Sequence, residues 1–543
     1  MRKATRRFVN SQAQLRRDLD EAFPPGVDGT ARAKGSTGNL GALVASGASR
    51  NVLDKAVSRV SMGHEKSERR SRSEDAGEPS RWDPAEQRAA PEHGTGEGKH
   101  GWTTMGQVDV STRLRRIAET AKAAPELSFT TLAHHIDEDW LREAFHRTRR
   151  DAAPGVDGAT AEQYAARLED NLAGLRERLR SGSYRAPPVR RVHIPKGSGQ
   201  ETRPIGVPTF EDKVAQRAVA MVLEAVYEQD FQPFSYGFRP GRSAHDALDE
   251  LRQTAMDVHG GWVVEVDIRK CFDTIVHAEL MEVLRRRIRD GVLLRLIGKW
   301  LHAGVMERDN LYYPEAGTPQ GGVISPLLAN VFLHDVVDEW VVKDVRPRLR
   351  GRAGLVRYAD DMVFVFELEE DARRVLEVLP KRFGKYGLTL HPDKTRLVDF
   401  RRPPRHPPES GSGGSGPGSF GFLGFTHHWA RSRAGAWVVK RRTAKDRFRR
   451  TLRRLHDYCR AHRHDPVQAQ QRALNRRLRG HYAYFGMTGN TVALTRMYRG
   501  VRAAWRRWLN MRSQRAHMTW ARFYELLKRL PLAPPRLAPR YAS

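Results

Sequence analysis

The strongest structural signal in the sequence is the segment Leu355-Val-Arg-Tyr-Ala-Asp-Asp-Met-Val-Phe-Val-Phe366. Two apolar runs, rich in β-branched and aromatic residues, flank the adjacent carboxylates of Asp360 and Asp361. This pattern predicts a β-hairpin with the two acids at its turn. Adjacent carboxylates repel each other and resist burial, and a divalent cation relieves both costs. An ordinary aspartate-rich turn is the alternative interpretation.

A second apolar run, Trp262-Val-Val-Glu-Val-Asp-Ile268, predicts a strand that carries Asp267 close to its end. A carboxylate here and a pair on the hairpin can converge on two Mg²⁺ ions, which prefer few carboxylates together with substrate phosphates. Two such ions support nucleotidyl transfer. Asp273 competes for this role, and a strand-end turn is the plainer interpretation of Asp267. We favour Asp267 because it directly follows the apolar run.

The charge of the chain is concentrated at one end. The 543 residues carry a formal net charge of +30, and residues 431–543 hold 29 Lys and Arg against four acidic residues, a net +25. Such an excess indicates a polyanionic partner, either nucleic acid or an anionic membrane surface. Tyrosines and tryptophans lie among these arginines and favour nucleic acid, although each aromatic has an equal claim to a place in a helical core.

Other features exclude several classes of protein. Two cysteines, Cys271 and Cys459, make neither a disulfide framework nor a paired zinc site, so we expect a reducing, cytoplasmic location and no disulfide-linked partner. No apolar run is long enough to span a bilayer, so we expect no membrane partner. Periodicity predicts strands over 190–194 and 420–425 and helices over 137–150, 161–180, 215–227, 442–461, 466–484 and 492–511.

The two acidic segments belong to a series of short motifs. Over about residues 130–510, this series resembles that of the reverse transcriptase/maturase family encoded by group II introns. A single short motif would be weak evidence, but eight in family order are strong. They are Ala153–Gly158, Val192–Lys196 with Thr202–Thr209, Ser235–Ser243, Asp267–Phe272, Gly317–Pro326, Tyr358–Asp361, Gly387–Thr395 and Phe422–Phe425.

The resemblance implies a right-hand polymerase of α/β (α+β) class. Its fingers and palm would combine antiparallel sheet with packed helices, and an α-helical thumb/maturase domain would follow. The implied layout is a disordered N-terminal extension over 1–105, a further extension with the fingers over 106–260, the palm over 261–401, a flexible linker over 402–419, a primer-grip strand with the thumb over 420–520, and a C-terminal tail over 521–543.

The resemblance also implies roles for single residues around the acids. Asp267, Asp360 and Asp361 would be catalytic and would hold two Mg²⁺ ions, for which Mn²⁺ could substitute, with the carbonyl of Ile268 as a further ligand. The Phe272 ring would exclude a ribose 2′-hydroxyl and so favour dNTPs, although a core position is its plainer interpretation. The implied nucleotide-binding residues are Lys196, Arg203, Phe272, Gln320, Gly321 and Lys394.

The basic C-terminal region resembles the thumb and maturase region of the family. Leu474–Gly480, followed by Tyr482 and Tyr484, is similar to its maturase signature, with His481 at a position where relatives usually carry Trp. Phosphate contacts and shape recognition suit an arginine-rich surface. The implied nucleic-acid-binding residues are Arg476, Arg477, Arg479, Tyr482, Tyr484, Arg506 and Arg507.

These features predict an RNA-directed DNA polymerase that also aids the splicing and mobility of its own intron. Its partners would be an RNA template, the intron RNA, a DNA primer or target, and dNTPs, in the cytoplasm of a bacterium. No cysteine follows Cys459, so we expect the class that lacks an endonuclease. The alternatives are a reverse transcriptase that serves the host, in CRISPR-associated spacer acquisition or phage defence, and a non-catalytic RNA-binding splicing factor.

Overall fold

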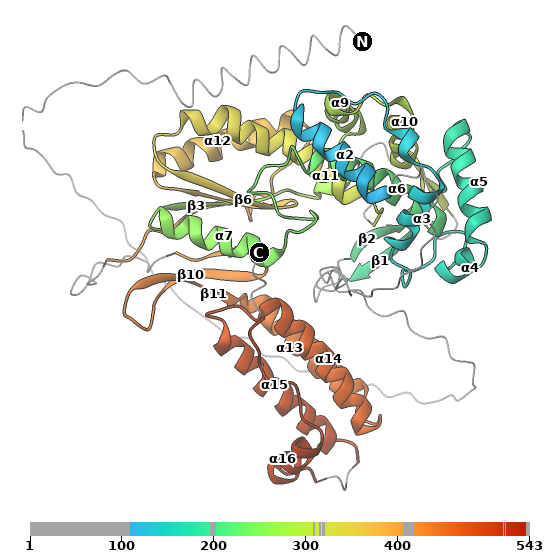
Figure 1. Ribbon diagram of the computed structural model, residues 1–543. Coiled ribbons are helices and arrows are strands. Elements are labelled where there is room, and N and C mark those ends of the chain that lie inside the picture. The colour runs from blue at the N-terminus through green and yellow to red at the C-terminus, as the bar shows by residue number, and fades with distance from the viewer. Residues whose placement is uncertain are drawn as a thin grey trace, which may run out of the picture. The chain divides into compact units, whose positions relative to one another are not determined.

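A computed structural model describes residues 109–195, 202–307, 310–313, 317, 321–404, 418–513, 515 and 517–538 (Figure 1). The statements below concern these residues. Some predictions fall outside these residues. They are the expected disorder over 1–105, most of the predicted linker over 402–419, and the nucleotide-binding roles of Lys196 and Gln320.

A four-stranded antiparallel sheet forms the centre of the described chain. The predicted hairpin is confirmed, and its second strand also pairs with the strand that carries Asp267. The sheet order is β6 (Ala353–Tyr358), β7 (Asp361–Phe366), β3 (Trp262–Asp267) and β8 (Arg396–Asp399).

Both faces of this sheet are buried, which explains why its strands are almost continuously apolar. Along β7, Met362 and Phe364 join one core, together with apolar residues of α12 (Glu369–Lys385). Val363 and Val365 join the opposite core with residues of α7 (Ala244–Asp257). Figure 1 shows α12 and α7 on opposite sides of the sheet. Because alternate side chains of a strand point to opposite faces, the sheet has no face left for solvent.

Two further sheets, one of four strands and one of three, flank this centre. The first has the order β2 (Thr202–Val207), β1 (Val189–Pro195), β4 (Val305–Glu307), β5 (Asn310–Tyr312), and its β1 and β4 run parallel, unlike the antiparallel arrangement that we expect. Parallel neighbours need a long crossover, which helices between β2 and β4 provide. The second sheet holds β11 (Trp437–Thr443), β10 (Phe425–Arg431) and β9 (Phe420–Phe422). The predicted strand over 420–425 is thus two strands, joined by a turn at which Leu423 and Gly424 have positive φ.

Helices surround the sheets on the N-terminal side. The predicted helix over 161–180 is divided, because Arg167 leaves the helical conformation between α4 and α5. The longest of these helices, α6, is buried on nearly all sides and forms the middle of the larger core. The set comprises α2 (Val110–Ala123), α3 (Glu138–His146), α4 (Ala161–Ala165), α5 (Leu168–Ser181), α6 (Phe210–Tyr227), α8 (Cys271–Thr274), α9 (His277–Arg287), α10 (Gly291–Leu301) and α11 (Ser325–Leu333), followed by π-helical segments η3 (His334–Asp338) and η4 (Val341–Val345).

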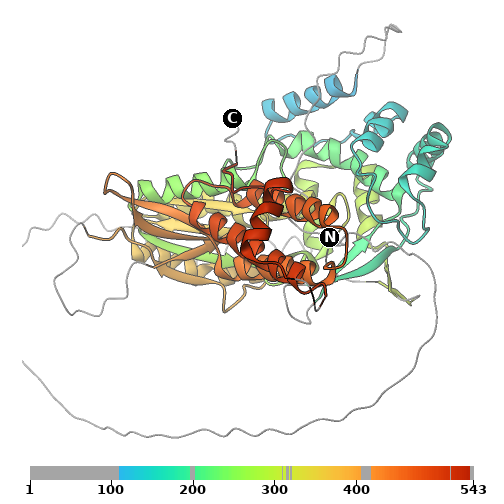
Figure 2. The same ribbon diagram turned by 90° about the horizontal axis from the view of Figure 1, so that it is seen from below.

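The three helices predicted in the basic region are confirmed as α13 (Lys445–Ala461), α14 (Val467–Phe485) and α15 (Thr491–Asn510). Figures 1 and 2 show them side by side. A fourth helix, α16 (Trp520–Arg529), lies where the sequence predicts a tail. Phe523 of α16 is fully buried against Trp505, so this segment belongs to the core of the helical region. Within the described residues, no helix has the length and apolar character required to cross a membrane.

Candidate active site

The acidic hairpin turns within two residues. Tyr358 pairs with Asp361, so Ala359 and Asp360 alone make the connection between β6 and β7. Ala359 has a φ of 56°, in the left-handed region that two-residue hairpins require. A side chain in this region costs about 1–2 kcal/mol, so the surrounding structure must hold the turn in place.

Strand register brings the third carboxylate to this turn. Asp267 at the end of β3 lies directly opposite Asp361 of β7, and Asp360 stands in the adjacent turn. Residues opposite each other in antiparallel strands have Cβ atoms about 4.5–5.5 Å apart. The structure therefore brings the three acids predicted from sequence to one end of the central sheet.

The electrostatics of this cluster are those of crowded anions. Burial, and then the neighbouring charge of Asp360, raise the pKa of Asp361 from 3.8 to about 7. Burial and the charge of Asp267 also raise the pKa of Asp360, against the opposing fields of Arg203 and Lys394. The site thus holds more negative charge than its own surroundings stabilise.

The donor set fits Mg²⁺ that enters together with substrate. No group of three or more His, Cys, Asp and Glu side chains within the described ranges is arranged as a ready-made metal cage. Instead the Lys394 ammonium forms an ion pair with the carboxylate of Asp267. Mg²⁺ characteristically takes one or two carboxylates and completes its shell with phosphates and water. A few crowded carboxylates beside a displaceable cation match that preference.

Ile268, the predicted backbone ligand, follows Asp267 directly. It bridges to Leu390, but the hydrogen bonds of that bridge come from its neighbours: His391 N donates to Asp267 O at 2.8 Å, and Arg269 N donates to Thr389 O at 2.8 Å. The carbonyl of Ile268 takes no part in these two bonds. Since successive carbonyls along a strand point to opposite edges, this carbonyl faces the side on which β7 lies.

A buried network that the sequence analysis missed lies behind the turn. Arg357, the second-last residue of β6, is fully buried and donates to the turn carbonyl of Ala359 at 3.2 Å. The same guanidinium donates to Asn330 Oδ1 at 3.0 Å and to both carboxylate oxygens of Asp338, which is also fully buried. Burial opposes ionisation of Asp338, but the charges and hydrogen bonds of Arg357 and His334 together outweigh burial and lower the pKa of Asp338. The sequence feature that could have indicated this network is an arginine inside an otherwise apolar strand.

A glycine brings a third segment against the turn. A Cβ atom at Gly237 would lie 2.9 Å from the Tyr358 carbonyl carbon and still closer to the amide of Ala359. The flanking backbone pairs with β6, since Tyr236 N donates to Arg357 O and Arg357 N donates to Phe234 O, both at 2.9 Å. The Ser235–Ser243 motif is thereby the support of the acidic hairpin, and Gly237 is the residue that permits the contact.

The four predicted nucleotide-binding residues that the structure describes lie on a strand, a helix and two turns. Arg203 is exposed on β2, and Lys394 holds Asp267. Phe272, on α8, is half-buried against the larger core. Gly321 has a φ of 114°, and a Cβ there would lie 2.5 Å from Gly206 O of β2. The close approach of Gly321 to β2 is therefore available only to glycine.

The predicted nucleic-acid-binding residues divide by helix face. Arg476, Arg477 and Arg479 on α14 and Arg507 on α15 are exposed. Arg506 is partly buried, stacks on Trp520 with 4.4 Å to the ring centroid, and donates to Met518 O.

The two predicted tyrosines pack against protein. Tyr482 is only 4% exposed and belongs to the core of the helical region. Tyr484 is half-buried, and its hydroxyl donates to Leu423 O at 2.9 Å. Leu423 in turn gives its backbone N–H to Asp361, so Tyr484 connects α14 to the acidic site. Tyr482 thus packs in the core of the helical region, and Tyr484 links α14 to Leu423. Neither ring lies on a solvent-facing surface.

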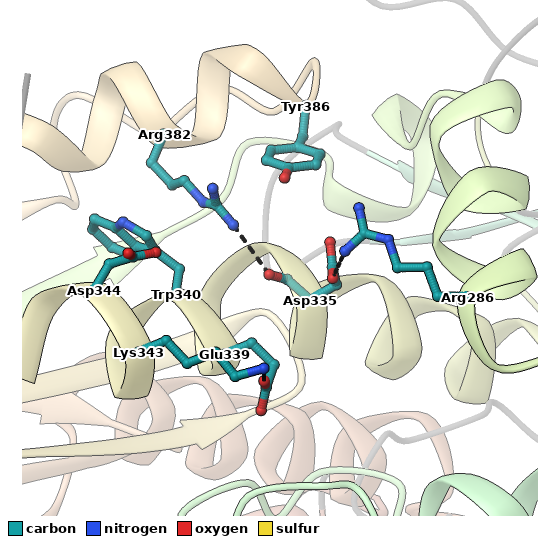
Figure 3. A pocket seen from close by; sticks show the side chains of 8 residues that line it. All are labelled: Arg286, Asp335, Glu339, Trp340, Lys343, Asp344, Arg382 and Tyr386. Carbon is teal, nitrogen blue, oxygen red and sulfur yellow. Dashed lines mark hydrogen bonds and ion pairs between the residues drawn. The ribbon is translucent and has the colours of Figure 1, made fainter. Parts of the chain in front are cut away.

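A separate hollow of about 150 Å³ lies between α9, the π-helical segments and α12 (Figure 3). Its charges are matched internally: Asp335 pairs with Arg286, and Glu339 pairs with Lys343. Arg382 stacks on Trp340 and on Tyr386. None of the residues predicted to act in catalysis or binding lines it. We therefore regard the acidic turn, and not this hollow, as the candidate active site.

Comparison with known proteins supports the same site. The family model for reverse transcriptase (RNA-dependent DNA polymerase) matches residues 194–427, a range that includes all three acids. The chain is 35% identical to protein YkfC of Escherichia coli, over 53% of this chain and 84% of that protein. It is 33% identical to the group II intron-encoded protein LtrA of Lactococcus lactis, over 50% of this chain and 46% of LtrA. The chain belongs to the group II intron reverse transcriptase/maturase family.

Membership of this family makes the chain an RNA-directed DNA polymerase by class, and the resemblance seen in the eight motifs is confirmed. A further relative, nuclear intron maturase 4 of Arabidopsis thaliana, is 29% identical over 23% of this chain and 16% of its own length. The chain thus spans most of YkfC but only about half of LtrA.

Proposed function

We propose that this reverse transcriptase copies RNA into DNA with two Mg²⁺ ions held by Asp267, Asp360 and Asp361 and by the carbonyl of Ile268. The observation that carries the proposal is the register pair Asp267–Asp361 beside Asp360. Bound there, the ions would activate the primer 3′-hydroxyl and stabilise the leaving pyrophosphate. The raised pKa values of Asp360 and Asp361 support it, because both carboxylates require a counter-charge to be fully ionised.

The cations near the acids support binding of a nucleoside triphosphate. Arg203 and Lys394 exert fields on Asp360, and both would neutralise the phosphates of the incoming nucleotide. Lys394 has a second role while substrate is absent, because it stabilises the Asp267 carboxylate. We assign Lys196 and Gln320 to the same nucleotide by family resemblance.

Phe272 is the proposed gate for the sugar. Its ring is half-buried and packs against the larger core, and this packing would hold it in place against a 2′-hydroxyl. Gly321 lies against β2, the strand that carries Arg203, which supports its assignment to the same nucleotide. The expected substrate is therefore a dNTP rather than an rNTP.

We assign a right-hand arrangement to these parts, with an N-terminal extension and the fingers over 106–260, the palm over 261–401, and a primer-grip strand with the thumb over 420–520. Exposed Arg476, Arg477, Arg479 and Arg507 would bind phosphates of the template duplex and of the intron RNA. The family's maturase members support an additional role in splicing and mobility of the intron. The proposed partners are the RNA template, the intron RNA and a DNA primer or target.

Primer extension tests the proposal. Wild-type protein with an RNA template, a DNA primer, dNTPs and Mg²⁺ should yield DNA, whereas rNTPs should yield little. The double variant Asp360→Asn with Asp361→Asn should yield none, while Asp393→Asn, an exposed acid next to Lys394, should extend normally. Failure of the wild type to extend, together with tight RNA binding, would replace the polymerase by a non-catalytic splicing factor.

A further inference from the structure

His277, the first residue of α9, binds a backbone atom of a different motif. Its side chain is buried, at 5% exposure, and its Nε2 lies 2.6 Å from the carbonyl oxygen of Gly317. A carbonyl only accepts, so Nε2 must carry the proton and donate it. The other ring nitrogen, Nδ1, is buried without a hydrogen-bond partner. Burial lowers the pKa of His277, which agrees with a neutral ring.

Both backbone polar atoms of Gly317 form hydrogen bonds. While its carbonyl accepts from His277, its amide donates to Ile275 O at 2.8 Å. Its φ of 95° and its lack of a side chain allow this, since a Cβ would lie 3.0 Å from Phe272 O and from Asp273 O. Gly317 therefore lies directly on the backbone of the segment that carries Phe272.

We propose that His277 is a positioning residue for the dNTP site, which fixes Gly317 against the backbone of the segment that carries Phe272. The inference rests on the proposed function, in which Phe272 contacts the sugar and Gly321 lies beside the nucleotide. Gly321 is held separately by β2. The imidazole thus joins Gly317 to the segment that carries Phe272. Loss of the bond would allow Gly317 to move away from Phe272.

The neighbouring His302 provides a matched control. Its ring lies 5.0 Å from that of His277, at 75°, but it is exposed and its Nδ1 contacts Gly298 O within its own helix. His302→Phe changes the surroundings of His277 without removing the bond to Gly317. His277→Phe removes the donor but keeps a ring of similar size, and His277→Gln restores an N–H donor without the ring.

Steady-state primer extension separates positioning from folding. We expect His277→Phe to raise the KM for dNTPs about tenfold, equivalent to ~1.4 kcal/mol, with kcat changed less than about twofold. His277→Gln should recover most of the loss, and His302→Phe should resemble wild type. A residue needed only for folding would reduce the amount of active protein and leave KM unchanged. Equal KM values in wild type and both His277 variants would overturn the proposal.

Hydrogen exchange of the full-length protein supplies a readout that does not depend on activity. The Gly317 amide should exchange faster in His277→Phe than in wild type and His302→Phe, because the carbonyl of Gly317 loses its donor and the bond from the Gly317 amide to Ile275 O then holds the residue alone. Unchanged exchange would refute the anchoring. If the wild type made no DNA, the proposed function would fail, whereas faster exchange in His277→Phe would still establish the anchoring of Gly317.

Discussion

The acidic hairpin and the basic helices α13–α15 both concentrate charge, but they use it differently. Behind the hairpin turn, Arg357 of β6 and Asp338 of η3 are fully buried and pair with each other. On α14, the arginines of the maturase-like segment are exposed. Buried charge must be paired and therefore fixes atoms in place, whereas exposed charge attracts a polyanion and tolerates movement. Single substitutions should accordingly be severe in the hairpin and mild on the helices.

The largest effect should follow from Arg357→Met. This change removes the guanidinium partner of the buried Asp338, which keeps only a longer contact of 3.6 Å with His334, and should reduce the free energy of unfolding by ~3–5 kcal/mol. Chemical denaturation measures it. The double variant Arg357→Met with Asp338→Leu should regain stability but not polymerase activity, because Ala359 O still lacks its donor. If the double variant regained both stability and polymerase activity, the network would serve the fold alone.

Gly237→Ala tests positioning of the turn without any change of charge. The new methyl group would overlap the backbone of Tyr358 and Ala359 and displace the carboxylates. A displacement on the order of 1 Å can cost about 100-fold in rate, so we expect primer extension to fall by about that factor. Gly174→Ala, in α5 with open space around its Cβ position, is the control and should retain full activity. Normal extension by Gly237→Ala would show that the turn is not rigidly held.

The carboxylates predict a pH dependence of stability in the absence of metal. The pKa of Asp361 is raised to about 7, so the fold favours its protonated form. This contribution is fully present below about pH 4 and is lost as the pH rises towards 7. Between about pH 5 and pH 8, wild type should therefore lose stability relative to Asp361→Asn, and Mg²⁺ at the higher pH should restore part of the loss. The same difference in the free energy of unfolding between the two proteins at every pH would contradict this.

The smallest effects belong to the exposed arginines. Replacing Arg476 and Arg479 with Ala should weaken RNA binding several-fold and reduce the salt dependence of the binding constant by about one unit for each phosphate that is no longer neutralised. Filter binding over a range of salt concentrations measures both. Arg115→Ala, an exposed arginine on α2, is the matched control. The same change in slope for all three arginines would assign the effect to net charge rather than to a binding surface.

The motifs made much of the site predictable. The hairpin, the strand ending at Asp267 and the three basic helices were all expected and are all present. What escaped prediction depends on partners distant in the chain. The position of Arg357 in an apolar strand indicates burial but does not identify its partner Asp338, and the tryptophan and leucines of α16 gave too short a pattern beside so much basic sequence. Tyr482 is buried because its side of α14 faces α15, which the order of residues does not reveal.

The residue order therefore established the chemistry of this protein, because alternation, helical periodicity and net charge are properties of neighbouring residues. It indicated carboxylates for metal, basic residues for phosphate and a chain of the reverse transcriptase type. The tertiary structure established which groups meet: Asp267 with Asp361, Arg357 with Asp338, Gly237 with the turn and His277 with Gly317. These pairings arise from strand register and helix packing, which join segments far apart in the chain and have no signature in either segment alone.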